Sequence, residues 1–386
     1  MRIALYSMLA LACLSLSAGS VFAQAPKTAA ARQEAEIRQM LEELRRPPAG
    51  VPRAHIAEML GECGEPAVPL LLQTIDDSEE MIAQYAFVAL SRMQENAHAA
   101  IPRLTEIARD ESHPFRRDAV ATIALIGPRD AEVGNLLNEL LVNDAKGDLA
   151  LSVLHSYPVL RLQWKQVFVS ALRHSQRSVR SEALMLLGEM ETTAAPMADP
   201  VMASCDGQDY ELTEAACRAL TRMGVDAQPA LIRLSESDSV DVRHQALAAL
   251  SRSRPVTSEA AARFKQASAD ADAATRSWAA RGLAPVIHLP EARQVLLKLT
   301  SDEDADVRWQ AVRAIRQATF RLPEVASAMR EAMSDVHPSV RLEAAVAYWQ
   351  ATGEVDQPSR VLEELVATQS NSVGRASTAA LERMGR

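Results

Sequence analysis

The stretch SDEDADVRWQAVRAI, Ser301–Ile315, joins three alternating aspartates to a run of periodic apolar residues. Val307 and Ala311 are four positions apart, which places them on one face of a helix. The aspartates before them could belong to a calcium loop or to the turn of a helical hairpin. An EF-hand that begins at Asp302 requires glycine at its sixth position and glutamate at its twelfth, but these positions hold Val307 and Arg313. The hairpin turn is therefore favoured.

The same pattern recurs along the chain. A Val-Arg pair, an alanine four positions after the valine and further apolar residues at helical spacing begin most clearly at Val179, Val242, Val307 and Val340. Weaker copies begin at Pro52, Ile82, Phe115, Lys146, Leu212, Thr275 and Val373. Successive copies are separated by about 30 residues, a period typical of stacked helical hairpins. A second short apolar segment precedes each copy, as at Ala67–Ile75 and Glu291–Thr300. The sequence therefore predicts a solenoid of about eleven two-helix repeats over residues 33–386.

The repeats resemble the HEAT-repeat family, specifically the short bacterial type called PBS-lyase HEAT-like. The resemblance rests on the turn aspartate, the Val-Arg pair and the A-x-x-A-L core, and it covers nearly all of the chain after residue 32. It implies an all-α fold, a right-handed α-α superhelix in which the second helices line a concave face. It also implies a ladder of ion pairs between turn acids and the arginine that follows each opening residue. The arginines are Arg116, Arg180, Arg243, Arg276, Arg308 and Arg341.

The fourth repeat is the poorest copy, because Lys146 replaces the opening apolar residue. An apolar stripe is still expected at Ala150, Val153, Leu154 and Tyr157. We therefore expect a local bend or an irregular turn in this repeat.

The first residues, MRIALYSMLALACLSLSAGSVFAQ, resemble a secretory signal peptide. Arg2 precedes an apolar run that ends in Val21-Phe22-Ala23, so we expect cleavage after Ala23 and a short linker over residues 24–32. A retained membrane anchor or a lipoprotein site at Cys13 are the alternatives. The expected location is periplasmic or secreted, and the mature chain is expected to have no membrane span.

The composition is acidic, with 41 Lys and Arg against 50 Asp and Glu. Nucleic acid is therefore an unfavourable partner, because its phosphates require a basic face. Cys63, Cys205 and Cys217 remain after the predicted cleavage, and an odd number does not form a disulfide framework. Cys205 and Cys217 could form a disulfide, although it is simpler to interpret them as small apolar residues in or beside the core.

Catalytic patterns are weak. The eight histidines are scattered, none is followed by Glu, and no pair has the spacing of two ligands on one helix. The repeated His-Glu pairs of deoxyhypusine hydroxylase, another HEAT-like protein, are thus absent from the sequence. There is no glycine-rich phosphate loop and no G-x-S-x-G motif. We expect no enzyme activity, no cofactor and no metal site.

A partner surface is expected on the concave face of the last repeats, where large aromatic and arginine side chains gather. Trp and Arg are the residues most enriched at binding hot spots. The candidate residues are Arg218, Trp278, Arg281, Trp309, Arg313, Arg316 and Trp349. Solvated arginines and tryptophans that lie against neighbouring apolar stems are the alternative interpretation.

The predicted function is an exported, non-catalytic scaffold or adaptor that binds another protein through an acidic or extended segment. An enzyme or cofactor-handling protein of the lyase-like branch is one alternative. A structural protein of the cell envelope that associates through its end hairpins is another. The sequence leaves the oligomeric state open.

Overall fold

The computed structural model describes residues 28–77, 79–127, 129–143, 149–161, 164–205, 207–317 and 322–386, and these ranges fold into helices without strands. The expected signal peptide, residues 1–23, lies outside the described residues, as do Asp144, Lys146 and Asp206. The expected all-α class is confirmed.

In the first of two compact units, Met1–Pro128, the described residues form three helical hairpins. Its helices are α2 (Ala29–Arg45), α3 (Arg53–Glu62), α4 (Val68–Asp77), α5 (Glu80–Met93), α6 (Ile101–Arg109) and α7 (Arg116–Ile126). Short 3-10 turns, η1 (Glu65–Ala67) and η2 (Gln94–Ala100), precede α4 and α6. Helix α2 begins at Ala29, so helical structure starts inside the segment expected to be a linker.

The described residues of the second unit, Arg129–Arg386, form eight hairpins, which with the first three make the eleven expected repeats. The first helices of these hairpins are α8 (Ala131–Asn143), α11 (Lys165–Leu172), α13 (Ala198–Ala203), α15 (Gln228–Leu234), α17 (Ser258–Ala267), α19 (Pro290–Leu299), α21 (Pro323–Ala332) and α23 (Asp356–Thr368). The second helices are α9 (Leu149–Ser156), α12 (Arg177–Glu189), α14 (Tyr210–Arg222), α16 (Val240–Arg252), α18 (Ala273–Leu283), α20 (Ala305–Gln317), α22 (Pro338–Thr352) and α24 (Ser372–Arg383).

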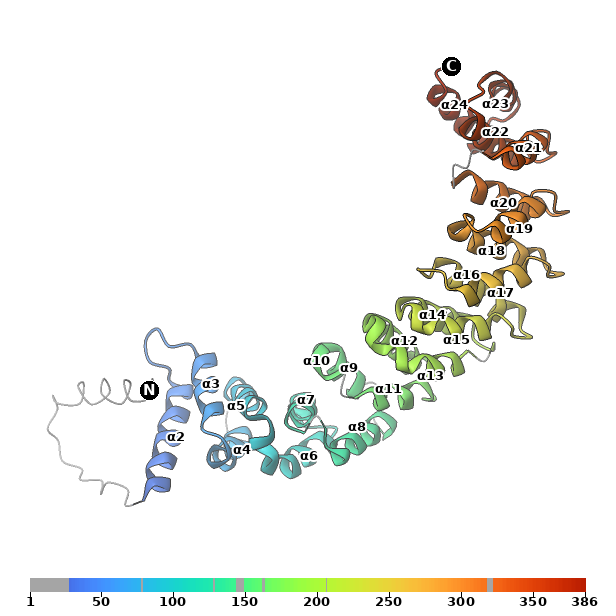
Figure 1. Ribbon diagram of the computed structural model, residues 1–386. Helices are drawn as coiled ribbons and strands as arrows, with labels where there is room; N and C mark the ends of the chain where they lie inside the picture. The colour runs from blue at the N-terminus through green and yellow to red at the C-terminus, as the bar shows by residue number, and fades with distance from the viewer. Residues whose placement is uncertain are drawn as a thin grey trace. The chain divides into compact units, whose positions relative to one another are not determined.

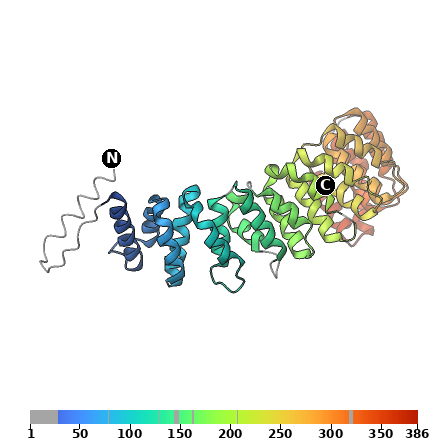
Figure 2. The ribbon, with the colours of Figure 1, turned by 90° about the horizontal axis from the view of Figure 1, so that it is seen from below.

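Successive second helices from α12 to α22 pack side by side and make one layer of this unit, while the first helices make the other (Figures 1 and 2). Short 3-10 turns join several repeats, including η3 (Glu191–Met197), η4 (Val225–Ala227) and η5 (Ala284–Val286). Each second helix therefore begins at the turn inside its repeat and ends at the connection to the next repeat.

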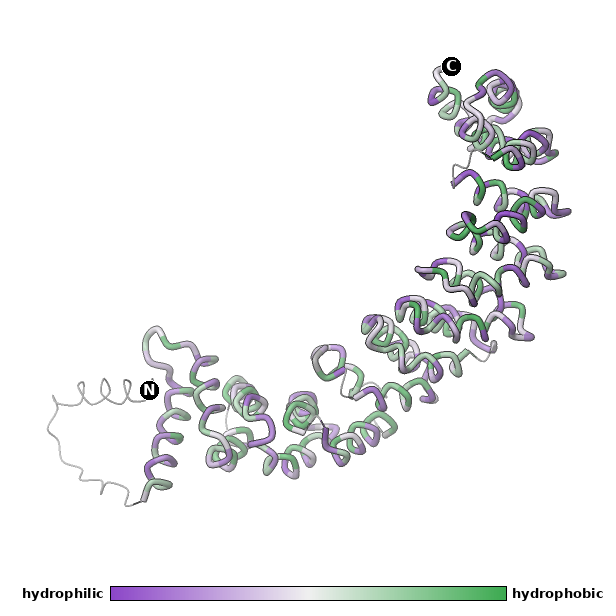
Figure 3. The backbone as a smooth tube through the Cα atoms, viewed as in Figure 1, coloured by the Kyte–Doolittle hydropathy of each residue, from purple (hydrophilic) through white to green (hydrophobic). Residues whose placement is uncertain are grey.

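The core lies between the stacked hairpins. The opening valines of the four clearest copies, Val179, Val242, Val307 and Val340, are at most 2% exposed, as the periodicity predicts. The alanines four positions later, Ala183, Ala246, Ala311 and Ala344, are fully buried. Figure 3 shows hydrophobic and hydrophilic residues alternating along the helices. Small residues in the second helices let neighbouring backbones approach closely, and larger side chains fill the remaining space.

Gly282 gives the clearest example of this close approach. A Cβ at this position in α18 would lie 2.3 Å from the ring of Phe264 in α17, and Phe264 is fully buried. Any larger side chain would push the two helices of the repeat apart.

The fourth repeat is irregular, as its weak pattern predicts. Helix α9 ends at Ser156 and is followed by the four-residue helix α10 (Pro158–Arg161). Ala150, Val153 and Leu154 are buried as expected, but Tyr157 is 37% exposed, so its expected place on the apolar stripe is wrong. The helix has already ended before Tyr157, and the helical periodicity no longer applies there.

None of the helices in the described ranges combines the length and the apolar character needed to cross a membrane. Cys63, Cys205 and Cys217 are unbonded thiols, so the possible pairing of Cys205 with Cys217 is not formed. Cys217 is buried in α14, whereas Cys63 is only partly buried at the end of α3. Burial raises the pKa of the Cys63 thiol, with a further contribution from Glu36 and Glu62.

Candidate functional site

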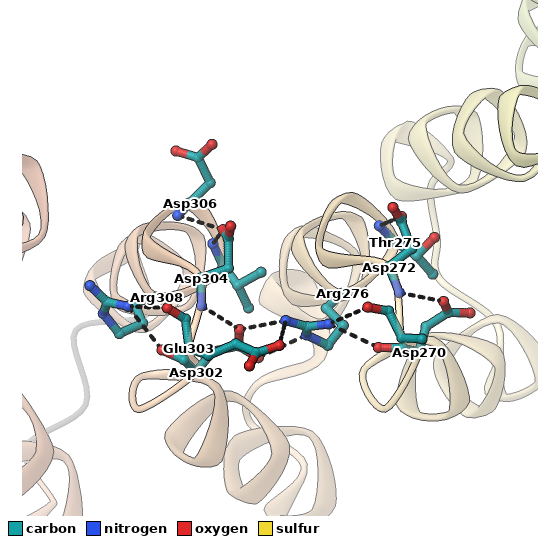
Figure 4. A network of polar contacts seen from close by, with 11 residues as sticks. Asp270, Asp272, Thr275, Arg276, Asp302, Glu303, Asp304, Asp306 and Arg308 are labelled. Atoms are coloured by element: carbon teal, nitrogen blue, oxygen red, sulfur yellow. Dashed lines mark hydrogen bonds and ion pairs between the residues drawn. The ribbon is translucent and has the colours of Figure 1, made fainter.

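The turns that begin the second helices are held by aspartates and arginines that bind one another (Figure 4). Asp304 precedes α20 and accepts hydrogen bonds from the backbone N–H groups of Asp306 (2.9 Å) and Val307 (3.2 Å). This is the N-cap arrangement that satisfies donors at a helix start. Asp302 accepts from the N–H of Asp304 at 2.9 Å. Asp306 lies in the first turn, where its charge suits the helix dipole.

Two arginines link successive repeats through these turns. Arg276 of α18 binds Asp302 through Nε (2.9 Å) and Nη2 (2.8 Å). Arg308 of α20 binds Asp335 in the same way, at 2.6 and 2.9 Å. All four side chains are nearly buried, with exposed fractions of 9 to 12%. These bidentate pairs confirm the expected ladder over repeats eight to ten.

In other repeats, the arginine that follows the opening residue of the second helix has a different partner. Arg180 and Arg243 donate from Nη1 to two backbone carbonyls of the turn that precedes their own helix. Arg276 and Arg308 make the same two bonds in addition to their ion pairs. Arg341 also binds its own turn and pairs with Glu364 at 3.8 Å. The common role of this arginine is thus to close its own turn.

The carboxylates of these turns are stabilised in their charged form. Burial alone would raise the pKa of Asp302, but the hydrogen bonds from Arg276 and from a backbone N–H outweigh it and lower that pKa. The same balance lowers the pKa of Asp335 beside Arg308. Asp272 caps α18 at Thr275 N (2.7 Å) and binds His244 Nε2 at 2.6 Å. These contacts overcome burial and lower the pKa of Asp272 to about 2.

The opposite ends of the second helices are basic and form a hollow. A cavity of about 720 Å³ lies where α16, α18 and α20 end, beside the connection that includes η5. Four guanidinium groups line it, together with neutral and apolar residues and no carboxylate. The lining residues are Ser251, Arg252, Arg254, Arg281, Ala284, Pro285, Ile287, His288, Gln310, Arg313, Ala314 and Gln317. We call this hollow the arginine cavity.

The guanidinium groups of the arginine cavity have no carboxylate in direct contact. Arg254 instead donates to the backbone carbonyls of Ser251 (2.8 Å) and Ser253 (2.7 Å), and the charge of Arg313 acts on Glu343 of α22. Among the residues that the structure describes, Arg252, Arg254, Arg281 and Arg313 form no ion pair with a carboxylate. Burial lowers the pKa of Arg281, and the nearby charges of Arg252, Arg313 and Arg254 lower it further. The negative ends of three helices offset only about half a charge each, so the cavity remains strongly positive. It is chemically suited to an anion.

Two of these arginines are held over tryptophan rings. The guanidinium carbon of Arg313 lies 4.9 Å from the ring centre of Trp309, and that of Arg281 lies 5.4 Å from the ring centre of Trp278. Each pair belongs to one helix. Both tryptophans are half-buried, whereas Arg281 and Arg313 are exposed. Stacking of this kind restricts the guanidinium and leaves its edges free to donate.

The structure places the seven residues expected at a partner surface in three settings. Arg281 and Arg313 line the arginine cavity, and Trp278 and Trp309 support them. Arg316 pairs with Glu343 of α22 at 2.6 Å, and Trp349 is half-buried on the same helix as Glu343. Arg218 lies on α14 and pairs with Glu214 at 3.5 Å, in a separate hollow of about 250 Å³ between α12 and α14.

Sequence reasoning did not identify Arg254 or the full role of Arg252. Arg252 is the last residue of α16, and Arg254 follows the end of that helix, where helical periodicity no longer places a side chain. Gln310 was also missed. Its Oε1 is buried without a hydrogen-bond partner, and the residue lines the arginine cavity. The signal that could have located them is the run of Arg252, Arg254 and Pro255 at a repeat connection.

Within the described part of the chain, no group of three or more His, Cys, Asp or Glu side chains is placed to hold a metal ion. The carboxylates of Asp302 and Asp304 are occupied by backbone donors and by Arg276. Their observed role is to build the hairpin turn.

Comparison with solved structures places the fold among large helical-repeat proteins. The karyopherin Kap121p bound to the SUMO protease Ulp1p is 13% identical, with a TM-score of 0.54 over 93% of this chain and 46% of that one. Kap121p bound to Nup53p is also 13% identical, with a TM-score of 0.52 over 99% and 48%. The chain therefore spans about half the length of these structures, and at this identity the likeness concerns the fold alone. Among curated proteins there is no match.

A family model described as HEAT repeats matches residues 37–126, 165–251, 198–284, 260–349 and 295–382. Together these matches cover both units and most of the chain. They agree with the stacked hairpins, the buried valines and alanines, and the aspartate-arginine turns. The protein belongs to the HEAT-repeat family.

Proposed function

We propose that this chain is a non-catalytic scaffold that binds an acidic segment of a partner protein in the arginine cavity. The observation that carries the proposal is the set of four guanidinium groups, none in an ion pair among the described residues, around one hollow without a carboxylate among its lining residues. Guanidinium groups bind carboxylates through paired N–H donors, and uncompensated positive charge favours an anionic partner. The karyopherin structures with a similar fold are complexes with protein partners, which supports a binding role.

We further propose that the protein is exported and acts in the periplasm or outside the cell. The proposal rests on the charged, apolar and small-residue regions of residues 1–23. We also propose that the chain belongs with the short bacterial type of HEAT-like protein, because the turn aspartate, the Val-Arg pair and the alanine-rich core recur in its repeats. Mass spectrometry of the protein recovered from the periplasm or the culture medium tests the export, and a chain that begins at Gln24 is expected. Recovery of the full-length chain from the cytoplasm would contradict it.

A binding experiment tests the proposed partner surface. The double variant Arg281→Gln with Arg313→Gln removes two charges from the cavity. Arg360→Gln with Arg383→Gln removes two exposed arginines from the last hairpin and is the matched control. Protein captured from cell-envelope extracts, and a fluorescent oligoglutamate peptide, are expected to bind the wild type and the control but not the cavity variant. Equal binding by all three chains would refute the proposal.

The tryptophans provide an independent arm of this experiment. Trp309→Ala removes the ring under Arg313, while Trp349→Ala removes a ring from a helix that does not line the cavity. The oligoglutamate affinity is expected to fall in the first variant and to change less in the second. The reverse order would move the partner surface from the arginine cavity to α22.

A further inference from the structure

The hollow of about 250 Å³ between α12 and α14 has an apolar floor and a charged rim, and we call it the α12–α14 hollow. Apart from Ser181, Arg218 and Arg222, its lining is apolar and consists of Leu184, Met185, Gly188, Ala215 and Ala219. Met185 is 47% exposed at the rim, whereas Leu184 and Gly188 are buried in the floor. Small-molecule sites begin at about 300 Å³, so a smaller hollow suits a single large side chain.

Small residues on both helices open this hollow. In the four repeats that follow, the third position after the opening residue of the second helix has a larger side chain, as in Gln245, Trp278, Gln310 and Glu343. In α14 this position is Ala215. On α12, Gly188 has no side chain, and a Cβ there would lie 3.4 Å from the Cα of Ala219. The hollow therefore exists at this junction because neither helix fills it.

Two arginines stand one helical turn apart on the rim. Arg218 and Arg222 both belong to α14, and both side chains are exposed. Arg218 pairs with Glu214 at 3.5 Å, whereas Arg222 forms no ion pair among the described residues. The stem of Arg222 crosses beside the floor, because its Cδ lies 3.7 Å from the place of a Cβ on Gly188. An apolar side chain in the hollow would thus lie next to an unpaired guanidinium group.

The last residue of a polypeptide offers both groups that the hollow can bind. Its carboxylate and its side chain are attached to the same Cα, and a guanidinium group binds a carboxylate through paired N–H donors. In an extended chain, by contrast, neighbouring side chains point to opposite faces. An acidic neighbour of an internal apolar residue would therefore point away from the hollow. A chain end matches the hollow better than an internal acidic residue.

We infer that the α12–α14 hollow binds the free carboxyl end of a polypeptide whose last residue is large and apolar. Arg222, with Arg218 one turn away, holds the terminal carboxylate. The last side chain lies in the hollow against Gly188 and Ala215, and the flexible side chain of Met185 adapts to its shape. The inference goes beyond the proposed function, because this site shares no residue with the arginine cavity.

Three fluorescent, otherwise neutral peptides of equal length test the chemistry of the ligand. The first ends in leucine with a free carboxylate, the second is the same peptide with an amidated end, and the third ends in glycine with a free carboxylate. Fluorescence anisotropy is expected to show about tenfold tighter binding of the first peptide than of either other peptide. Equal binding of the first and second peptides, or of the first and third, would overturn the inference.

Variants of the hollow test its place. Ala215→Gln introduces the side chain that repeats seven and nine have at this position, and it is expected to weaken the leucine-ended peptide about tenfold. Ala376→Gln makes the same change at the same position of the last repeat, where the alanine is exposed, and is the matched control. Circular dichroism checks that both variants fold. Unchanged binding by a folded Ala215→Gln chain would refute the site.

A charge variant tests the role of the rim. Arg222→Gln is expected to bind the leucine-ended peptide no more tightly than the wild type binds the amidated peptide. Arg383→Gln, which removes an exposed arginine at the end of the last helix, is the control. If Arg222→Gln still distinguishes the free carboxylate from the amide as the wild type does, Arg222 does not hold the carboxylate and the inference is wrong.

An oligoglutamate peptide with an amidated end separates this inference from the proposed function. Its binding should be unchanged by Ala215→Gln, and binding of the leucine-ended peptide should be unchanged by Arg281→Gln with Arg313→Gln. If the cavity variant alone weakens the leucine-ended peptide, the chain end binds in the arginine cavity and the inference is overturned. If oligoglutamate does not bind but the leucine-ended peptide behaves as expected, the proposed function fails and the α12–α14 site stands.

Discussion

The two ends of the second helices use arginine in opposite ways. At the N-terminal ends, Arg276 and Arg308 are nearly buried, bind carboxylates bidentately and donate to turn carbonyls. At the C-terminal ends, Arg252, Arg281 and Arg313 are exposed and face one another around a hollow. The same residue type thus contributes to folding where its charge is matched, and we propose that it contributes to recognition where it has no carboxylate partner.

Removal of a buried arginine is expected to give the largest difference between the two ends. Arg276→Met leaves Asp302 as an uncompensated, nearly buried charge and removes two bonds to turn carbonyls. A loss of about 3 kcal/mol in the free energy of unfolding is expected. Arg281→Met, on the same helix, should change it by less than about 0.5 kcal/mol. Urea denaturation followed by circular dichroism measures both, and similar losses would remove the distinction.

Acid is expected to weaken the N-terminal ends selectively. The folded chain lowers the pKa of Asp272 to about 2, below its unfolded value, so the charged form favours folding. This contribution is complete above about pH 4 and is lost as the pH falls through about 2. Allowing for solvent screening, it is about 1 kcal/mol.

Asp272→Ala should therefore be less stable than the wild type at pH 6, and the difference should shrink as the pH approaches 2. Urea midpoints measured between these pH values test this expectation. Asp306→Ala is the control, because Asp306 lies in a first turn as an exposed residue without an arginine partner among the described residues. A difference that stays constant with pH would contradict the role of the Asp272 carboxylate.

Removal of the Arg281 charge is expected to raise the stability of the fold slightly, because it relieves repulsion between arginines at the C-terminal ends of the second helices. Burial and the neighbouring arginines lower the pKa of Arg281, so its charged form is less favourable in the folded chain than in the unfolded chain. Arg281→Gln should therefore raise the urea midpoint by a small amount at low salt, and 0.5 M sodium chloride should reduce that gain. A lower midpoint would show that Arg281 supports the fold.

The smallest expected effect is optical. Arg313→Ala uncovers one face of the half-buried Trp309 ring. The tryptophan emission should shift to longer wavelength, with greater quenching by acrylamide. Arg316→Ala removes the ion pair with Glu343 instead and should shift the emission less. Equal spectra for the two variants would contradict the stacking.

Sequence periodicity predicted the fold well because each repeat has buried apolar residues at the same helical spacing. Val242 and Ala246 are buried for the same reason as Val307 and Ala311, and every copy strengthens the interpretation of the others. The prediction of side-chain positions failed beyond the ends of the helices. Tyr157 and Arg254 follow the last residues of α9 and α16, so helical spacing could not place them.

The proposed partner surface could be predicted only in part from sequence periodicity. The spacing of Trp309 and Arg313 on one helix already indicates contact, since residues four apart are neighbours. The meeting of Arg252, Arg254, Arg281 and Arg313 depends instead on how three helices and a repeat connection pack. The ion-pair ladder likewise could not be predicted from spacing alone, because it depends on how close each arginine lies to the turn of the next repeat. Arg276 and Arg308 lie close enough to bind the aspartate of that turn.

The double attachment of Arg276 and Arg308 has a mechanical consequence. In a linear array of hairpins, each unit is coupled to its neighbours alone, so the overall cooperativity depends on the strength of each junction. The junctions spanned by these two side chains resist separation more than a junction that relies on apolar packing. A pull on the chain ends would therefore open the array elsewhere first, and repeats eight to ten would stay together as one block while their neighbours unravel.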